Sequence, residues 1–133
     1  MGLKQMMETL IGKSSDDSDK GAAAAAGEKA KYHRISAKEA KAALDSGEPV
    51  ILLDVREPYE YKAGHIKNAV SLPSGNVASG AAAVVPDRDA KILVYCLSGA
   101  RSNASAHALV RMGYTNVFDF GGIADWPYEV VTK

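Results

Sequence analysis

Two nearly continuous apolar runs constrain the fold of this chain more than any other feature. They are PVILLDV at 49–55 and KILVYC at 91–96. Strands with one solvated face alternate apolar and polar side chains, whereas the strands of a parallel sheet are buried on both faces and show little alternation. We therefore predict that the two runs are central parallel strands. Two further strands are predicted at 69–72, which ends before Pro73, and at 116–120.

The segments around these strands carry helical signals. Ser36 and Glu39 have the spacing of a capping box, which predicts a helix that ends at Gly47. A second helix is predicted over 102–114, with an apolar face made of Ala104, Ala108, Leu109 and Met112. Strand, helix and strand in this order imply right-handed crossovers and a parallel sheet flanked by helices. The predicted fold class is α/β.

The composition of the chain changes near Tyr32. Residues 14–31 consist mainly of Ser, Asp, Ala, Lys and Glu, with too few large apolar side chains to offset the entropy of ordering. We predict a flexible tail over 1–31 and a single domain over 32–133. Before residue 14, apolar residues recur at helical spacing. Both a partner-binding or membrane-surface element and a frayed terminus remain open for this stretch.

The composition argues against several classes of function. Lys plus Arg and Asp plus Glu number 16 each and no basic run appears, which speaks against nucleic-acid binding. No apolar stretch approaches the ~20 residues of a membrane span, and the N-terminus lacks the apolar core of a signal peptide. A single cysteine excludes an internal disulfide and a Cys-rich zinc site. We expect a cytoplasmic monomer that needs no metal and no cofactor.

Cys96 comes where a buried strand is predicted to end and a helix to begin. Ligands of α/β proteins bind at this edge of the sheet, where backbone N–H groups and a helix N-terminus form an anion-binding nest. A cysteine there is expected to have a lowered pKa and to react as the thiolate. Gly99 permits a tight turn, Arg101 adds a cation and Ser102 is expected to cap the helix. The predicted substrate-binding cradle consists of Leu97, Ser98, Gly99, Ala100, Arg101 and Ser102.

This arrangement predicts sulfur transfer through a persulfide on Cys96. The thiolate would attack the outer sulfur of an anionic donor, and N–H groups of the loop would hold the persulfide until an external thiol or cyanide removes the sulfur. Because the chain has no second cysteine, an intramolecular disulfide cannot release the sulfur. The alternative is a buried structural cysteine, which is the usual role of a lone Cys.

The loop is one of three motifs that together resemble a known family. They are C-x-x-G-x-R-S at 96–102, LLDVREPYEYKAGHIKNAVSLP at 52–73 and GGIADWP at 121–127. In this order they resemble the rhodanese homology family, and the resemblance covers roughly residues 32–133. It implies a compact three-layer fold, in which helices cover both faces of a parallel sheet of about five strands. It also implies the activity of a single-domain rhodanese, a thiosulfate sulfurtransferase.

The length of the loop distinguishes two kinds of chemistry. Cys96 and Arg101 are spaced as Cys-x4-Arg, whereas phosphatases with a similar cradle have Cys-x5-Arg. A phosphate needs a wider ring of N–H groups than a single sulfur atom does. The spacing therefore favours sulfur transfer over phosphatase or arsenate-reductase chemistry.

Asp54 and Arg56 are predicted to lie at the same edge of the sheet as Cys96, because they follow the strand at 49–55. Arg56 is a candidate for binding an anionic donor, and Asp54 is a candidate for orienting the loop. An ordinary ion pair, or a capping role for Asp54, is the alternative, and the sequence leaves both interpretations open.

Glu60 and His65 are candidates for supporting the loop rather than for binding the donor. Glu60 is a possible ion-pair partner of Arg101. His65 is interpreted as structural, with a proton role as the alternative. Leu97 is apolar and is expected at the mouth of the site, which suits docking of a protein persulfide donor as an alternative to thiosulfate.

Three functions are therefore ranked from the sequence. The first is a sulfurtransferase that moves sulfane sulfur from a donor such as thiosulfate to a thiol or to cyanide. The second is a persulfide carrier or interaction module that exchanges sulfur with partner proteins. Phosphatase or arsenate-reductase activity comes last, because of the loop length.

Overall fold

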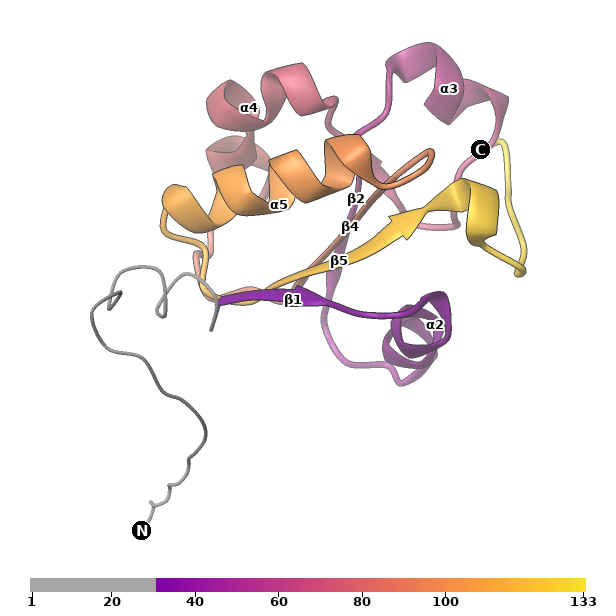
Figure 1. The fold of residues 1–133 in the computed structure, drawn as a ribbon, viewed down its shortest axis with the longest axis horizontal. Helices are drawn as coiled ribbons and strands as arrows, with labels where there is room; N and C mark the ends of the chain where they lie inside the picture. The colour runs from indigo at the N-terminus through magenta and orange to yellow at the C-terminus, as the bar shows by residue number, and fades with distance from the viewer. Residues whose placement is uncertain (1–30) are drawn as a thin grey trace, which may run out of the picture. The chain divides into compact units, whose positions relative to one another are not determined.

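The two apolar runs form the neighbouring strands at the centre of a parallel sheet, β2 (Ile51–Asp54) and β4 (Ile92–Cys96). The computed structural model describes residues 31–133, whose arrangement is shown in Figure 1. Apart from Lys31, the predicted tail at 1–31 lies outside the described residues. Within them, five strands pair in the order β1-β5-β4-β2-β3, and every neighbouring pair is parallel. The predicted α/β class is confirmed.

The outer strands differ from the sequence-based prediction. The strand expected at 69–72 is shorter, β3 (Val70–Ser71), and the strand expected at 116–120 continues to form β5 (Val117–Gly122). β1 (Tyr32–Arg34) was not predicted, because three residues at the edge of a sheet are too few to show periodicity. The two glycines after the predicted strand belong to β5, and Gly122 pairs with Cys96 after a shift in register.

Four α-helices connect these strands among the described residues. They are α2 (Ala37–Asp45), α3 (Pro58–Ala63), α4 (Val77–Val84) and α5 (Ala100–Arg111), and two single 3₁₀ turns lie at Ser74–Asn76 and Ile123–Asp125. The predicted capping box is confirmed at the start of α2. The Ser36 hydroxyl accepts from the Glu39 N–H at 3.0 Å, and the Glu39 carboxylate accepts from the Ser36 N–H at 2.8 Å.

The sheet separates two apolar cores. Successive side chains of β4 point to opposite faces of the sheet. Ile92, Val94 and Cys96 belong to the core under α4 and α5. Leu93 and Tyr95 belong to the core that includes α2. Figure 1 shows α4 and α5 on one side of the sheet and α2 on the other. This is the three-layer arrangement predicted from the family resemblance.

The predicted apolar face of α5 is confirmed in part. Leu109 is buried, and Ala108 and Met112 are partly buried against the core under α4 and α5, whereas Ala104 is exposed. The residues that α5 buries are Ser102, Ser105, Ala106, Leu109 and Val110. Two of these are serines, which hydrophobic periodicity does not mark as buried. Ser102 is buried because its hydroxyl has polar partners inside the sheet, a contact that the sequence pattern does not show.

We predict that Ser36→Ala lowers the free energy of unfolding by about 1 kcal/mol, because the Glu39 N–H loses its acceptor. Chemical denaturation of the full chain measures this change. Ser36→Asp is the matched control, since aspartate is an equally good N-cap residue, and it should unfold close to wild type. Equal loss of stability in both variants would contradict the capping interpretation.

Candidate active site

Cys96 is buried at the carboxyl end of β4, where the chain turns toward α5. Its Sγ accepts a hydrogen bond from the Gly99 N–H at 3.0 Å. Gly99 has a φ of 114°, in the left-handed region that favours glycine, and it is the N-cap residue of α5. The expected strand end, tight turn and helix start are therefore present around the cysteine.

The surroundings of Cys96 favour the thiolate. Burial of the thiol raises its pKa, since burial disfavours the charged form. Hydrogen bonding to the sulfur, led by the backbone N–H of Ser102 and including those of Gly99 and Ser98, outweighs burial and lowers the pKa below its ordinary value. The N-terminus of the twelve-residue helix α5 adds to this effect. The direction agrees with the expectation from the sequence.

The end of β5 packs directly against the backbone of the loop. A Cβ added to Gly122 would overlap the Leu97 carbonyl group and lie 2.6 Å from the Ser98 nitrogen. The Ala124 N–H donates to the Leu97 oxygen at 3.1 Å. The glycines of the third motif thus form a wall of bare backbone that holds the loop in place.

Ser102 does not cap α5, contrary to the prediction. The helix begins earlier, with Gly99 as its N-cap residue, and Ser102 therefore lies inside the first turn. Its Oγ is 2.8 Å from Oδ1 of Asp119, and 3.1 Å from the carbonyl oxygens of Gly99 and Gly121. Ser102 thus joins the first turn of α5 to β5.

Glu60 and Arg101 form the ion pair expected from the sequence. Nη1 of Arg101 lies 2.7 Å from Oε1 of Glu60, and Nη2 lies 3.2 Å from Oε2. This two-pronged contact lowers the pKa of Glu60 and raises that of Arg101. It links α3 to the loop, and it offsets the only charge that the loop contributes.

Asp54 and Arg56 form a buried ion pair. Nη2 of Arg56 is 2.6 Å from Oδ2 of Asp54 and 2.7 Å from the Gly64 oxygen. The Tyr95 hydroxyl donates to the same Oδ2 at 2.7 Å and accepts from the Ile66 N–H at 3.1 Å. The structure therefore contains the ion pair that was the alternative interpretation. Direct binding of a donor by Arg56 stays a prediction, and the contacts of its guanidinium do not favour it.

His65 connects the C-terminal segment to α3. Its ring stacks on Tyr61 with 3.7 Å between centroids, and its nitrogens lie 2.8 Å from the Tyr61 oxygen and 3.0 Å from the Lys133 oxygen. His65 also pairs with Val131 through two backbone hydrogen bonds. These contacts agree with a structural role and include no residue of the Cys96 loop.

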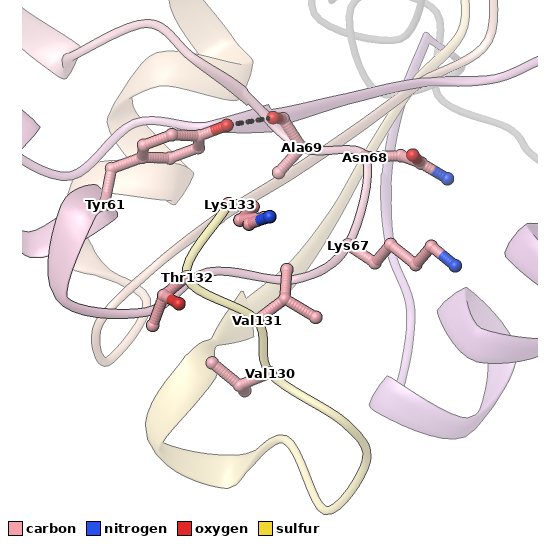
Figure 2. A pocket seen from close by; sticks show the side chains of 8 residues that line it. All are labelled: Tyr61, Lys67, Asn68, Ala69, Val130, Val131, Thr132 and Lys133. Atoms are coloured by element: carbon pink, nitrogen blue, oxygen red, sulfur yellow. Dashed lines mark hydrogen bonds between the residues drawn. The ribbon is translucent and has the colours of Figure 1, made fainter.

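A hollow of about 650 Å³ lies beside this C-terminal segment. Figure 2 shows the side chains that line it, with the Tyr61 hydroxyl donating to the Ala69 oxygen at 2.7 Å. The other lining residues are Lys67, Asn68, Val130, Val131, Thr132 and Lys133. None of them is a nucleophilic cysteine or belongs to the loop, so this hollow is separate from the predicted sulfur chemistry.

No group of three or more His, Cys, Asp or Glu side chains in residues 31–133 is placed to hold a metal ion. Over the same range, no helix combines the length and apolar character needed to cross a membrane.

Comparison with known proteins assigns the chain to a family. Residues 36–128 match the family model described as "Rhodanese-like domain". The chain belongs to the rhodanese-like domain family. The match spans all three motifs and includes Cys96, so the resemblance inferred from the sequence is confirmed.

Several relatives of this rhodanese-like chain have named activities. "Thiosulfate sulfurtransferase PspE" of Escherichia coli (strain K12) is 37% identical over 55% of this chain and 70% of its own length. "Thiosulfate sulfurtransferase GlpE" of Pseudomonas entomophila is 36% identical over 71% of this chain and 84% of its own length. A solved structure, "rhodanese with anions from E. coli", is 33% identical with a TM-score of 0.60, and the match covers 63% of this chain and 99% of that one.

A longer relative carries a similar region. "Probable adenylyltransferase/sulfurtransferase MoeZ" of Mycobacterium tuberculosis is 32% identical over 79% of this chain, but the match covers only 27% of MoeZ. Rhodanese-like regions thus occur alone and within larger proteins. Family membership supports sulfur transfer, and it does not identify the donor or the acceptor.

Sequence reasoning missed two residues that hold the site together. Asp119 is fully buried and bonds to Ser102, and Gly122 leaves room for the loop backbone. A signal for Asp119 was present, because a lone acidic residue in a strand predicted to be buried needs polar partners. The role of Gly122 depends on contact with Leu97, which is distant in the sequence, and no local pattern predicts it.

We predict that Gly122→Ala slows alkylation of Cys96 by iodoacetamide at neutral pH by about tenfold, since one lost charge-assisted hydrogen bond is worth about that factor. The added Cβ would displace the Leu97–Ser98 backbone and so disturb the N–H groups around the sulfur. Gly75→Ala is the matched control, because a Cβ there meets nothing within 4 Å. Wild-type alkylation in Gly122→Ala would show that this wall does not shape the site.

Proposed function

We propose that the chain is a sulfurtransferase that carries sulfane sulfur as a persulfide on Cys96. The observation behind the proposal is the position of Sγ, which lies at a strand end, 3.0 Å from the Gly99 nitrogen, with a lowered pKa. Relatives named thiosulfate sulfurtransferase support thiosulfate as a donor. Thiols and cyanide are the proposed acceptors.

The proposed reaction has two displacement steps. In the first, the Cys96 thiolate attacks the outer sulfur of thiosulfate, a Cys96 S–S bond forms, the S–S bond of thiosulfate breaks, and sulfite leaves with the electron pair. In the second, an acceptor thiolate or cyanide attacks the outer sulfur, and the Cys96 thiolate is the leaving group. No general base is required, because the nucleophile is already ionised. Loop N–H groups stabilise the anionic persulfide between the two steps.

The pairing of the nearby cations favours a second candidate, a persulfide carrier that exchanges sulfur with partner proteins. Arg101 is bound to Glu60 and Arg56 to Asp54, so neither guanidinium is free to attract the thiosulfate dianion. Leu97 is 44% exposed on the loop, and Tyr59 beside Glu60 is 73% exposed. Exposed apolar side chains on the loop and on α3 suit contact with a protein surface. Phosphatase chemistry gains no comparable support, because the loop keeps its short spacing.

We predict that the wild-type chain forms thiocyanate from thiosulfate and cyanide, and that Cys96→Ser does not, since the serine hydroxyl is not ionised at neutral pH. Colorimetric detection of thiocyanate gives the turnover. Intact mass spectrometry after thiosulfate treatment should show one added sulfur atom in the wild type and none in Cys96→Ser. Equal turnover by the two proteins would exclude the proposed reaction.

We further predict that Glu60→Gln raises kcat/KM for thiosulfate several-fold at low ionic strength and that added salt removes the gain. The substitution frees the Arg101 charge at the edge of the loop. Glu48→Gln is the matched control, because it frees Lys91, which lies before β4, at the opposite end of the strand from Cys96. If Glu60→Gln leaves thiosulfate kinetics unchanged, the paired arginine does not limit capture of the anionic donor.

A further inference from the structure

A buried carboxylate lies next to the sulfur site and has no part in the reaction described above. Asp119 is in β5 and pairs in register with Val94 of β4, so its side chain points toward α5. It is fully buried, and the nearest cation is Arg34, at 4.0 Å with a side chain that is 58% exposed. Asp119 is therefore not held by a buried ion pair.

Three neutral donors hold the Asp119 carboxylate instead. Oδ1 accepts from the Ser102 hydroxyl at 2.8 Å and from the Gly121 N–H at 2.9 Å, and Oδ2 accepts from the Tyr32 hydroxyl at 3.1 Å. Burial of Tyr32, and then the carboxylate itself, raise the pKa of this phenol, so it remains a protonated donor. A buried charge is expensive, and an apolar residue would fill the strand at lower cost. Stability alone therefore does not explain why a carboxylate is buried at position 119.

The two donors on Oδ1 come from the two sides of the cradle. Ser102 is in the first turn of α5, and its backbone N–H is among the groups that lower the pKa of Cys96, while its hydroxyl donates to Asp119. Gly121 precedes Gly122, whose backbone packs on the Leu97–Ser98 peptide. One oxygen atom thus joins the helix turn that binds the sulfur to the strand end that supports the loop.

We propose that Asp119 is a positioning residue that holds Ser102 and the end of β5 so that the N–H groups of the loop and of the first turn of α5 converge on the sulfur of Cys96. It touches neither donor nor acceptor and acts through those two groups. The inference rests on the proposed function in one respect, that Cys96 reacts as the thiolate. The alternative is a purely structural role, in which Asp119 and Tyr32 fasten β1 to β5.

The test is the pH dependence of Cys96 alkylation by iodoacetamide, which reports the thiolate whether or not sulfur is transferred. Relative to Asp119→Asn, which loses the same charge, Asp119→Ala should raise the midpoint by about one pH unit, so that alkylation below the midpoint is about tenfold slower. Asp119→Asn keeps an acceptor for Ser102 and Gly121, and it should leave the midpoint at or below that of wild type. Arg34 and Arg101 are unchanged in every variant, so the other charges near these two groups stay constant.

Tyr32→Phe is the matched control, because it removes the contact to Oδ2 and leaves both contacts to Oδ1. Its midpoint should equal that of wild type even where its melting temperature falls. Ser102→Ala should raise the midpoint, and Asp119→Ala combined with Ser102→Ala should raise it no further than the larger single change. That lack of additivity is expected if Asp119 acts through Ser102.

Two results would overturn the proposal. One is a lower melting temperature in Asp119→Ala with the same midpoint as Asp119→Asn, which is the signature of a structural role alone. The other is a wild-type midpoint in Ser102→Ala, which decides the question even where Asp119→Ala fails to fold. A shifted midpoint without persulfide formation would leave the positioning role standing and instead contradict the proposed function.

Discussion

Burial of β4 on both faces is the constraint on which the rest of the structure depends. Its side chains alternate between the core under α4 and α5 and the core that includes α2, so the strand must run through the middle of the sheet. A strand in that place ends at the carboxyl edge, next to the N-terminus of the following helix. Cys96 is its last residue, and the position of the thiol thus follows from packing before any chemistry is considered.

Features set by local sequence could be predicted, and those set by distant contacts could not. The central strands, the capping box of α2 and the turn at Gly99 depend on neighbouring residues, and the structure contains them. The Glu60–Arg101 pair is an exception, because it was predicted although its residues are 41 apart in the sequence. By contrast, the burial of Ser102 on α5 depends on its contact with Asp119, a partner 17 residues away in the sequence. Hydrophobic periodicity counts a serine as exposed, and it therefore fails where a polar side chain is buried with a partner.

The charged side chains around the site are paired with one another. They support the loop and do not create a strong local electrostatic potential. Arg56 is bound to Asp54 inside the edge of the sheet, and Arg101 is bound to Glu60 across to α3. Each pair fixes a segment next to the loop, and neither leaves its positive charge unpaired. The electrostatic stabilisation of a sulfur anion therefore falls to backbone N–H groups and the start of α5, whose dipoles require no counter-charge.

A cradle made of backbone explains which positions of the site tolerate change. The Cα of Gly121 lies 3.6 Å from the point where a Cβ on Gly99 would be, and Gly122 touches the Leu97 carbonyl, so strand and loop meet without side chains between them. The loop can therefore carry apolar Leu97 and Ala100 without losing its donors, because the donors are peptide groups. Selectivity for donor and acceptor must then come from side chains at the mouth, such as the exposed Leu97, rather than from the atoms that hold the sulfur. In the proposed sulfurtransferase, the backbone would therefore hold the sulfur and the side chains at the mouth would select the partner.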